Sequence, residues 1–171
     1  RGSDHRPNEA LHRALTAALG ATPPTYIHHG LILGPDGKKL SKRHGAVSVM
    51  QYEEDGYLPE AMINYLARLG WSHGDDEIFS RAQFLEWFNL DHLGRSAAQF
   101  DEAKLRWVNA QHLKAMADDA LAPLVAAQLH KRGIEADARM PALCALFKDR
   151  CDTIVALADW AQRFYTDVSA S

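Results

Sequence analysis

The part of the chain after Gly56 carries apolar residues at helical spacing through several successive segments, and this pattern constrains the fold most. The first segment begins at Pro59, a residue favoured at the first position of a helix, and ends at Gly70. Leucine and alanine are frequent whereas valine and isoleucine are sparse, which favours helix over strand. The sequence therefore predicts a mainly α fold with a small β element.

Further helices are predicted from capping residues and closing glycines. Ser80 and Asp101 have side chains that suit the N-cap position of a helix. Residues 118–131 predict another helix, which Gly133 closes, and residues 140–165 are long enough for one or two more. We interpret three of the four indoles in this part as core anchors rather than base-stacking platforms. They are Trp71, Trp87 and Trp107.

The N-terminal third of the chain has a different pattern. Residues 8–19 predict an amphipathic helix that Gly20 stops, and two prolines follow as a rigid connector. Residues 25–33 are β-prone and precede a turn at residues 34–37, so we expect a strand that leads into the next loop. Residues 44–49 predict a second short strand or an irregular return.

A glycine-bounded loop at residues 34–45, called the basic loop below, concentrates positive charge. Its four cations fall within six residues with no acid among them: Lys38, Lys39, Lys42 and Arg43. The whole chain has a net charge of -3, so everything outside these cations sums to -7 (-3 minus +4). Lysine supplies a mobile point charge and arginine a flat fork of donors, and both suit phosphate oxygens. The loop therefore predicts a polyphosphate ligand, and a solvated basic turn is the alternative.

The order Lys-Leu-Ser-Lys-Arg at residues 39–43 resembles the signature loop of class I aminoacyl-tRNA synthetases, in the form seen in glutamyl-tRNA synthetases. Other segments that resemble this family follow in the family's order. They are residues 1–5, 26–29, 36–48, 56–61, 64–66, 69–72 and 100–109. Beyond residue 115 the resemblance is only compositional.

The resemblance implies three regions. Residues 1–23 would be the C-terminal end of a Rossmann-type catalytic domain, residues 24–116 the basic loop with a helical region that contacts the tRNA stem, and residues 117–171 the start of a helical anticodon-binding region. The family's N-terminal His-x-Gly-His element is missing, so we expect an internal segment of a larger enzyme that is inactive alone. An Arg-Gly-Ser start also occurs as a cloning remnant, but the Asp-His pair that follows it favours the family.

The activity implied by the resemblance is that of a glutamate–tRNA ligase. Glutamate is joined to the α-phosphate of ATP as a glutamyl-adenylate, pyrophosphate leaves, and the glutamyl group then moves to tRNA(Glu). The implied partners are ATP, L-glutamate and tRNA(Glu), with Mg²⁺ bridging the phosphates although no carboxylate cluster is evident to hold it. No apolar run approaches the roughly 20 residues that cross a bilayer, and we expect a monomeric cytoplasmic enzyme without a structural metal.

Site residues are implied where positions match the family's motifs. The catalytic residues would be Lys39 and Lys42, whose charges neutralise the leaving pyrophosphate. The ATP-binding residues would be Lys42, Lys39, Arg43, Ser41, Asp4 and His5. Arg1 matches the position that faces the amino acid and would hold a glutamate carboxylate. His28 matches a family histidine, but Gly30 stands where these enzymes often carry proline, so we assign His28 a packing role.

The sequence does not identify the tRNA-binding residues. The candidates are cations on the predicted helices, which are equally well interpreted as solvated charges: Lys104, Arg106, Lys114, Lys131, Arg132 and Arg139. Two other functions are alternatives, namely a free-standing RNA- or protein-binding module derived from a synthetase and the related enzyme that glutamylates a modified tRNA base. The intact basic loop argues against both.

Three further features are interpreted as structural. Cys144 and Cys151 are predicted to be buried thiols rather than a disulfide or a zinc site. The nine histidines are scattered without the spacing of metal ligands. The acidic residues 75–77 are interpreted as a solvated turn.

Overall fold

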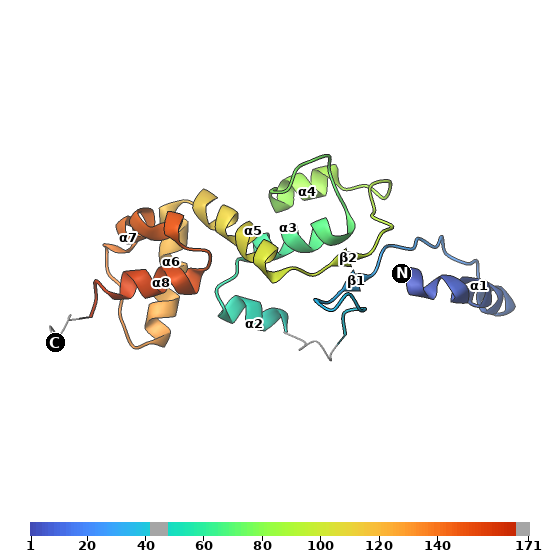
Figure 1. The fold of residues 1–171 in the computed structure, drawn as a ribbon, viewed down its shortest axis with the longest axis horizontal. Helices are drawn as coiled ribbons and strands as arrows, with labels where there is room; N and C mark the ends of the chain where they lie inside the picture. Colours follow the sequence, from blue (N-terminus) through green and yellow to red (C-terminus); the bar gives the residue numbers. More distant parts are fainter. Residues whose placement is uncertain (42–47, 167–171) are drawn as a thin grey trace.

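The computed structural model describes residues 1–41 and 48–166, and these residues are mainly helical, as predicted. The molecule is elongated, with an N-terminal arm at one end, a central body, and a C-terminal bundle at the other end (Figure 1). The arm consists of η1 (Ser3–Asn8) and α1 (Glu9–Ala18). The C-terminal bundle consists of α6 (Asp118–Lys131), α7 (Met140–Phe147), η3 (Lys148–Arg150) and α8 (Ile154–Gln162).

The central body holds the other helices and a two-stranded sheet. Its helices are α2 (Val49–Glu54), α3 (Pro59–Gly70), α4 (Arg81–Trp87) and α5 (Glu102–Ala115). The strands β1 (Ile32–Leu33) and β2 (Ala98–Gln99) pair in parallel, with Ile32 opposite Ala98. The strand predicted over residues 25–33 is therefore much shorter than expected, because the partner strand offers only two residues for pairing.

Helix starts in the central body follow the predicted capping residues. Ser80 Oγ accepts a hydrogen bond from the Gln83 N–H at 3.1 Å, and the Gln83 side chain accepts one from the Ser80 N–H at 2.9 Å. Asp101 Oδ1 accepts from two N–H groups in the first turn of α5, at 2.9 and 3.2 Å. These bonds satisfy donors that a helix leaves unpaired at its N-terminus. Gly133 follows α6 with a φ of 76°, which a glycine adopts without steric cost.

The second short strand or irregular return predicted over residues 44–49 can be tested at two residues: Ser48 lies in neither helix nor strand, in agreement with an irregular return, whereas Val49 is helical and departs from the prediction. Residues 44–47 lie outside the described part of the chain. Val49 opens α2 instead, and Ser48 Oγ caps this helix by accepting from the Met50 N–H at 3.3 Å. The Ser48 side chain favours a helix start at Val49, whereas the β-branched valine taken alone favours a strand.

The predicted helix over residues 8–19 is present as α1, but it contributes no buried side chain. Its apolar face is open to solvent in this chain, with exposed fractions of 59% for Leu11, 53% for Leu15 and 85% for Leu19. The arm is therefore amphipathic in sequence without packing on a core.

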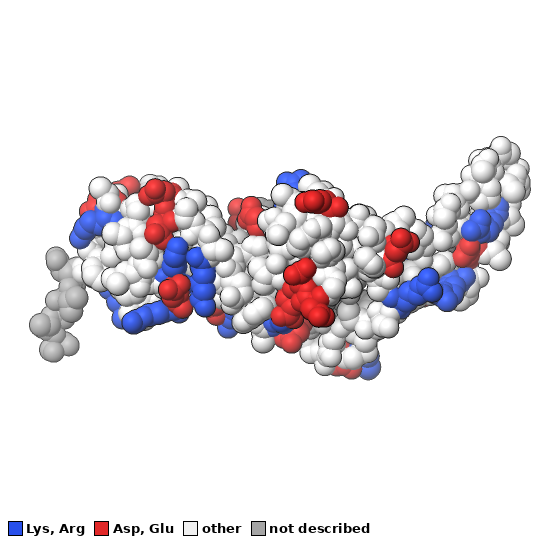
Figure 2. Space-filling model, turned by 90° about the horizontal axis from the view of Figure 1, so that it is seen from above, with Lys and Arg blue, Asp and Glu red and all other residues white. Residues whose placement is uncertain are grey.

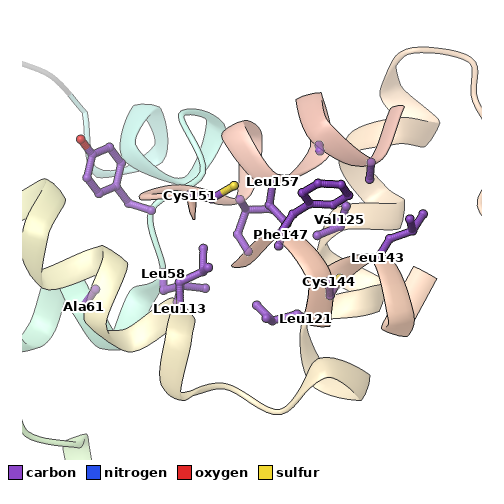
Figure 3. Close-up of a cluster of buried hydrophobic side chains, with 14 of the residues drawn as sticks. Leu58, Ala61, Leu113, Leu121, Val125, Leu143, Cys144, Phe147, Cys151 and Leu157 are labelled. Carbon is purple, nitrogen blue, oxygen red and sulfur yellow. The ribbon is translucent and has the colours of Figure 1, made fainter. Parts of the chain in front are cut away.

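Most of the core lies where the C-terminal bundle meets α3 and α5 (Figure 3). Leu113 of α5, Leu121 and Val125 of α6 and Leu157 of α8 are all fully buried. Figure 3 shows these side chains converging with Cys144 of α7 between the helices. Burial of large aliphatic side chains stabilises a fold by about 1.5–3 kcal/mol each. The helices of the bundle are therefore stabilised by a core that they share with α3 and α5.

The three indoles have different environments. Trp71 is a core anchor as predicted: it is 4% exposed and packs edge-on against Phe79 and Phe84, with ring centroids 5.8 and 5.1 Å apart. Trp87 is partly buried and stacks on His73 at 4.0 Å. Trp107 is 41% exposed, so its prediction as a core anchor is wrong. It lies on the outer side of α5, where Lys104 Nζ lies 4.0 Å from the ring centroid.

Candidate functional site

The first half of the basic loop is fixed on the sheet. The Gly34 N–H donates to the Lys38 carbonyl at 2.8 Å and the Leu40 N–H to the Ile32 carbonyl at 2.8 Å, so the chain folds back on β1. Gln99 of β2 donates from Nε2 to the carbonyls of Gly34 and Pro35, at 3.1 and 3.0 Å. The described part of the basic loop, residues 34–41, is therefore attached to both strands.

The start of the chain lies beside the segment that leads into β1. The His29 N–H donates to the Arg1 carbonyl and the Ser3 N–H donates to the His29 carbonyl, both at 2.9 Å. On its other side this segment is close to the loop before β2, because the Gly30 N–H donates to the Gly94 carbonyl at 3.0 Å. A Cβ on Gly30 would lie 1.8 Å from the Ser96 carbonyl oxygen, so only glycine fits there.

These contacts border an open cavity of about 340 Å³ between η1, β1 and the basic loop. It is lined by Gly2, Asp4, His5, His29, Leu31, Ile32, Lys39 and Leu40. The Lys39 ammonium forms an ion pair with Asp4 Oδ2. The hydrogen bond from Lys39 lowers the pKa of Asp4 below its ordinary value, and the positive charge of Lys39 acts in the same direction. The cavity thus has one cation and one carboxylate at its edge.

The chemistry of the lining suits a ligand with a flat apolar part and an anionic part. Leu31, Ile32 and Leu40 supply apolar wall, and His5 and His29 supply imidazole rings. The Lys39 side chain is 61% exposed and its ammonium has three donors, so it can bind a phosphate while it remains near Asp4. A nucleoside polyphosphate combines both parts.

The structure brings together three of the residues implied for ATP binding, Asp4, His5 and Lys39. Ser41 is exposed and does not line the cavity. Lys42 and Arg43 lie outside the described residues.

Arg1 lies apart from the cavity. Its guanidinium contacts Nδ1 of His12 in α1 and lies 5.3 Å from the centroid of the Tyr26 ring. Arg13 lies over the same ring at 4.8 Å. The Arg1 side chain therefore belongs to a cluster with Tyr26 and with residues of α1, and it does not line the cavity that contains Lys39.

His29 and Gly2 line the cavity without having been assigned to the site from the sequence. The doubled histidine at residues 28–29 was the available signal, and the family match favoured the first of the two. His28 is the buried one, with a side chain 9% exposed and Nδ1 3.7 Å from Glu9 Oε2. Its Nε2 has no hydrogen-bond partner among the described residues.

Four of the six cations considered for tRNA binding form ion pairs with carboxylates of the same chain. Lys104 Nζ lies 2.9 Å from Glu77 Oε1 and lowers the pKa of that carboxyl, so the acidic turn at residues 75–77 is not simply solvated. The remaining pairs are Arg106–Asp152, Arg132–Asp159 and Arg139–Asp137, at 3.6, 2.8 and 2.9 Å. An RNA phosphate that binds one of these four cations would have to displace its carboxylate partner or share the cation with it.

The described residues contain no group of three side chains suited to hold a metal ion. In the same part of the chain, no helix combines the length and the apolarity needed to span a membrane.

Comparison with known families places this geometry in context. The model of the family described as tRNA synthetases class I (E and Q), catalytic domain, matches residues 1–107. The chain belongs to this family. The match includes the whole cavity and the basic loop, and it ends inside α5. The mainly α chain with its small parallel sheet is thus a part of the class I synthetase fold, and the resemblance stated from the sequence is confirmed.

The relatives of this synthetase chain include two glutamate–tRNA ligases of high identity. The ligase of Albidiferax ferrireducens is 70% identical over 99% of this chain, and that of Verminephrobacter eiseniae is 68% identical over 99%. The chain spans 37% of the length of each. A solved glutamate tRNA ligase from Elizabethkingia meningosepticum, in complex with its amino acid, superposes with a TM-score of 0.85 at 32% identity over 99% of this chain and 38% of its own.

Proposed function

We propose that this synthetase chain supplies the ATP-binding basic loop of a glutamate–tRNA ligase, which attaches glutamate to tRNA(Glu) through a glutamyl-adenylate. The observation that carries the proposal is the position of Lys39. This signature lysine reaches the cavity from the basic loop and pairs with Asp4, which comes from a different segment of the chain. The identity to glutamate–tRNA ligases over nearly the full chain supports the choice of glutamate.

In this function Lys39 and Lys42 neutralise the charge that develops on the leaving pyrophosphate. Asp4 keeps the Lys39 ammonium at the edge of the cavity until the phosphates arrive. Asp4 and His5 contact the nucleoside, and Arg43 and Ser41 contact ATP from the loop. Arg1 holds the carboxylate of glutamate from the side of the arm. Magnesium enters as part of the ATP substrate.

The helices carry the tRNA contacts in this proposal. The central body, within residues 24–116, contacts the tRNA stem, and residues 117–171 begin the anticodon-binding region, while residues 1–23 end the catalytic domain. Figure 2 shows acidic side chains gathered over the middle of one face, with lysine and arginine toward both ends. Acidic side chains also lie among the basic ones toward the ends, so the proposed stem contact of the central body would fall outside the acidic middle of this face. The enzyme acts as a monomer in the cytoplasm.

The test is Lys39→Ala in the protein that contains this chain, with Lys38→Ala as the matched control. Lys38 carries the same charge in the same loop but does not line the cavity. We expect Lys39→Ala to slow glutamate- and tRNA-dependent pyrophosphate release about 100- to 1000-fold, because it removes a preorganised charge. Lys38→Ala should slow it less than about threefold, since an exposed charge outside the cavity is screened by salt.

Measuring tRNA binding distinguishes a role of Lys39 in adenylate formation from a general electrostatic attraction of RNA. Its dissociation constant should change less than about threefold in both variants, because one of many phosphate contacts contributes little. Lys42→Ala is expected to behave like Lys39→Ala. An equal loss of pyrophosphate release and tRNA affinity would contradict the proposal. If the unaltered protein releases no pyrophosphate but binds RNA, a non-catalytic binding module is the better account.

A further inference from the structure

We propose that the central body and the C-terminal bundle act toward RNA as one rigid unit, and that Lys148 is a positioning residue that holds them together. The sequence predicts a boundary between residues 116 and 117, where a hinge would let the two parts move. Three attachments, made by Gly56, Asn109 and Lys148 with their partners, cross this boundary; together they are called the joint below. The consequence for tRNA rests on the proposed function, whereas the joint rests on the described contacts alone.

Lys148 makes the first attachment, at the covalent connection between α5 and α6. It lies in η3, and its ammonium donates to the carbonyl of Met116, the C-cap of α5, at 2.9 Å. The same ammonium forms an ion pair with Oδ1 of Asp118, the first residue of α6, at 2.8 Å. The Lys148 side chain is 18% exposed, so water competes little for its charge. One side chain thus binds both sides of the predicted boundary.

Asn109 makes the second attachment, between α5 and the chain before α8. Its Nδ2 donates to the Asp152 carbonyl at 2.6 Å, and its Oδ1 accepts from the Leu58 N–H at 2.8 Å. The side chain is fully buried, so neither bond can be replaced by a bond to water. Arg106, also in α5, lies 3.6 Å from the carboxylate of Asp152. Arg106 was a candidate for RNA contact, but this ion pair places it beside the joint.

Gly56 makes the third attachment, from the chain before α3. Its carbonyl accepts from the Ile154 N–H, in the first turn of α8, at 2.9 Å. Its φ is 88°, and a Cβ at this position would lie 2.6 Å from the backbone nitrogen of Val155. A side chain at residue 56 would therefore prevent this backbone contact.

A shared apolar core fills the space between these attachments. One buried cluster contains residues of α3 and α5 together with residues of α6, α7 and α8. Figure 3 shows Leu113 of the body and Leu121 and Leu157 of the bundle within this cluster. Parts of a chain move relative to each other by default unless an apolar interface holds them. A single attachment would permit a hinge, whereas three attachments around a packed core fix the angle between body and bundle.

A fixed angle matters when one RNA molecule contacts both parts. Exposed cations of the body, such as Lys114 in α5, and of the bundle, such as Lys131 in α6, are then held at a constant separation. Once RNA has bound one part, binding to the other is intramolecular, and its strength depends on whether the separation matches the RNA. A loose joint would spread the separations and lower the affinity without removing any contact.

The first experiment measures the joint by electron paramagnetic resonance between two spin labels in the 171-residue chain. The labels are attached at Glu86→Cys in α4 and Ala127→Cys in α6, which are exposed, whereas the two native cysteines are buried. Lys148→Met keeps the apolar stem but removes the donors and the charge, so it should broaden the distance distribution about twofold. Lys114→Met is the matched control, the same substitution at an exposed lysine, and should leave the width unchanged.

The second experiment measures tRNA(Glu) binding by the protein that contains this chain. Lys148→Met should raise the Kd about tenfold, because the two binding parts are no longer pre-organised. The slope of log Kd against log salt should remain that of the unaltered protein, since no phosphate contact is lost. Any loss of affinity in Lys114→Met should instead come with a slope smaller by about 0.9, because that variant removes an exposed cation.

Kinetics distinguish positioning from a loss of folded enzyme. In Lys148→Met the KM for tRNA should rise with the Kd, while kcat at saturating tRNA and the KM for ATP should stay within about twofold. A smaller folded fraction would instead lower kcat and leave the KM for tRNA unchanged. If circular dichroism shows that Lys148→Met does not fold, Asp118→Asn removes only the ion pair, and it should change both measurements in the same direction.

The outcomes separate this inference from the proposed function. An unchanged distance distribution in folded Lys148→Met would overturn the joint. Broadening without a loss of tRNA affinity would overturn its role in RNA binding. If the unaltered protein binds no tRNA, the proposed function fails, and the distance distribution still decides whether Lys148 holds the body and the bundle together.

Discussion

The two ends of this molecule differ in how their amphipathic helices are used. The N-terminal arm and the C-terminal bundle both contain helices with apolar faces, yet α1 buries no side chain whereas α6, α7 and α8 each bury three or four. Leu15 of α1 is 53% exposed and Leu157 of α8 is 0% exposed. Amphipathic spacing therefore identifies a helix but does not say whether the same chain covers its apolar face.

The strongest test of this difference is a matched pair of leucine truncations in the 171-residue chain. Leu157→Ala should lower the free energy of unfolding by about 2–5 kcal/mol, because it leaves a cavity in a packed core. Leu15→Ala should change it by less than about 1 kcal/mol, as exposed substitutions do. Denaturant titration measures both values. Equal losses would break the comparison, since they would mean that the apolar face of α1 is covered in solution.

A second test uses the thiols of the bundle. Burial raises the pKa of Cys144 and of Cys151 to about 11, from an ordinary value of 9.0. At pH 8 the thiolate fraction of each is then about 100-fold below that of a free thiol, and alkylation by iodoacetamide should be slower by at least this factor. Mass spectrometry follows the rate against that in denaturant.

The same shift predicts how stability depends on pH. These thiols hold their protons to higher pH in the folded chain than in the unfolded chain, so folding is weakened as the pH rises from 9 toward 11. Cys144→Ser with Cys151→Ser should remove this part of the pH dependence. Rapid alkylation of the native chain at pH 8 would show instead that the bundle opens readily.

The smallest expected difference concerns helix caps at the two ends. Thr153 Oγ1 accepts from the Ala156 N–H at 3.1 Å and caps α8, whereas Asn8 makes no such side-chain bond at α1. Thr153→Ala should destabilise the chain by about 1 kcal/mol and Asn8→Ala by a few tenths at most. Thermal unfolding of the two variants checks this. A larger effect for Asn8→Ala would indicate that α1 takes part in the cooperative unit.

Helices with local signals could be predicted from the sequence. Pro59, Ser80 and Asp101 each act within one turn of their own position, so the starts of α3, α4 and α5 follow from neighbouring residues alone. The bounds predicted for residues 118–131 are those of α6. Trp107 was misplaced because a large apolar side chain on a helix can also lie on its outer face, where the Lys104 ammonium lies over the ring.

Features that depend on distant partners could not be predicted in the same way. The strand at residues 25–33 shortens to Ile32–Leu33 because pairing is limited by β2, which is far along the chain. The ion pair of Lys39 with Asp4 joins positions that no spacing rule connects. The charge of the basic loop predicted a polyphosphate ligand for Lys39, whereas Asp4 was assigned to ATP only through the resemblance, and their meeting at one cavity is a property of the fold.

The pairing of β1 with β2 has a consequence for the order in which the protein becomes able to work. Ile32 cannot pair until Ala98 has been synthesised, 66 residues later (98 minus 32). Gln99 can then donate hydrogen bonds to the carbonyls of Gly34 and Pro35. A ribosome that adds about 5–20 residues per second needs roughly 3–13 s for that interval. During synthesis the basic loop is therefore made before β2, the strand that supports it, and α3 and α4 are added in between.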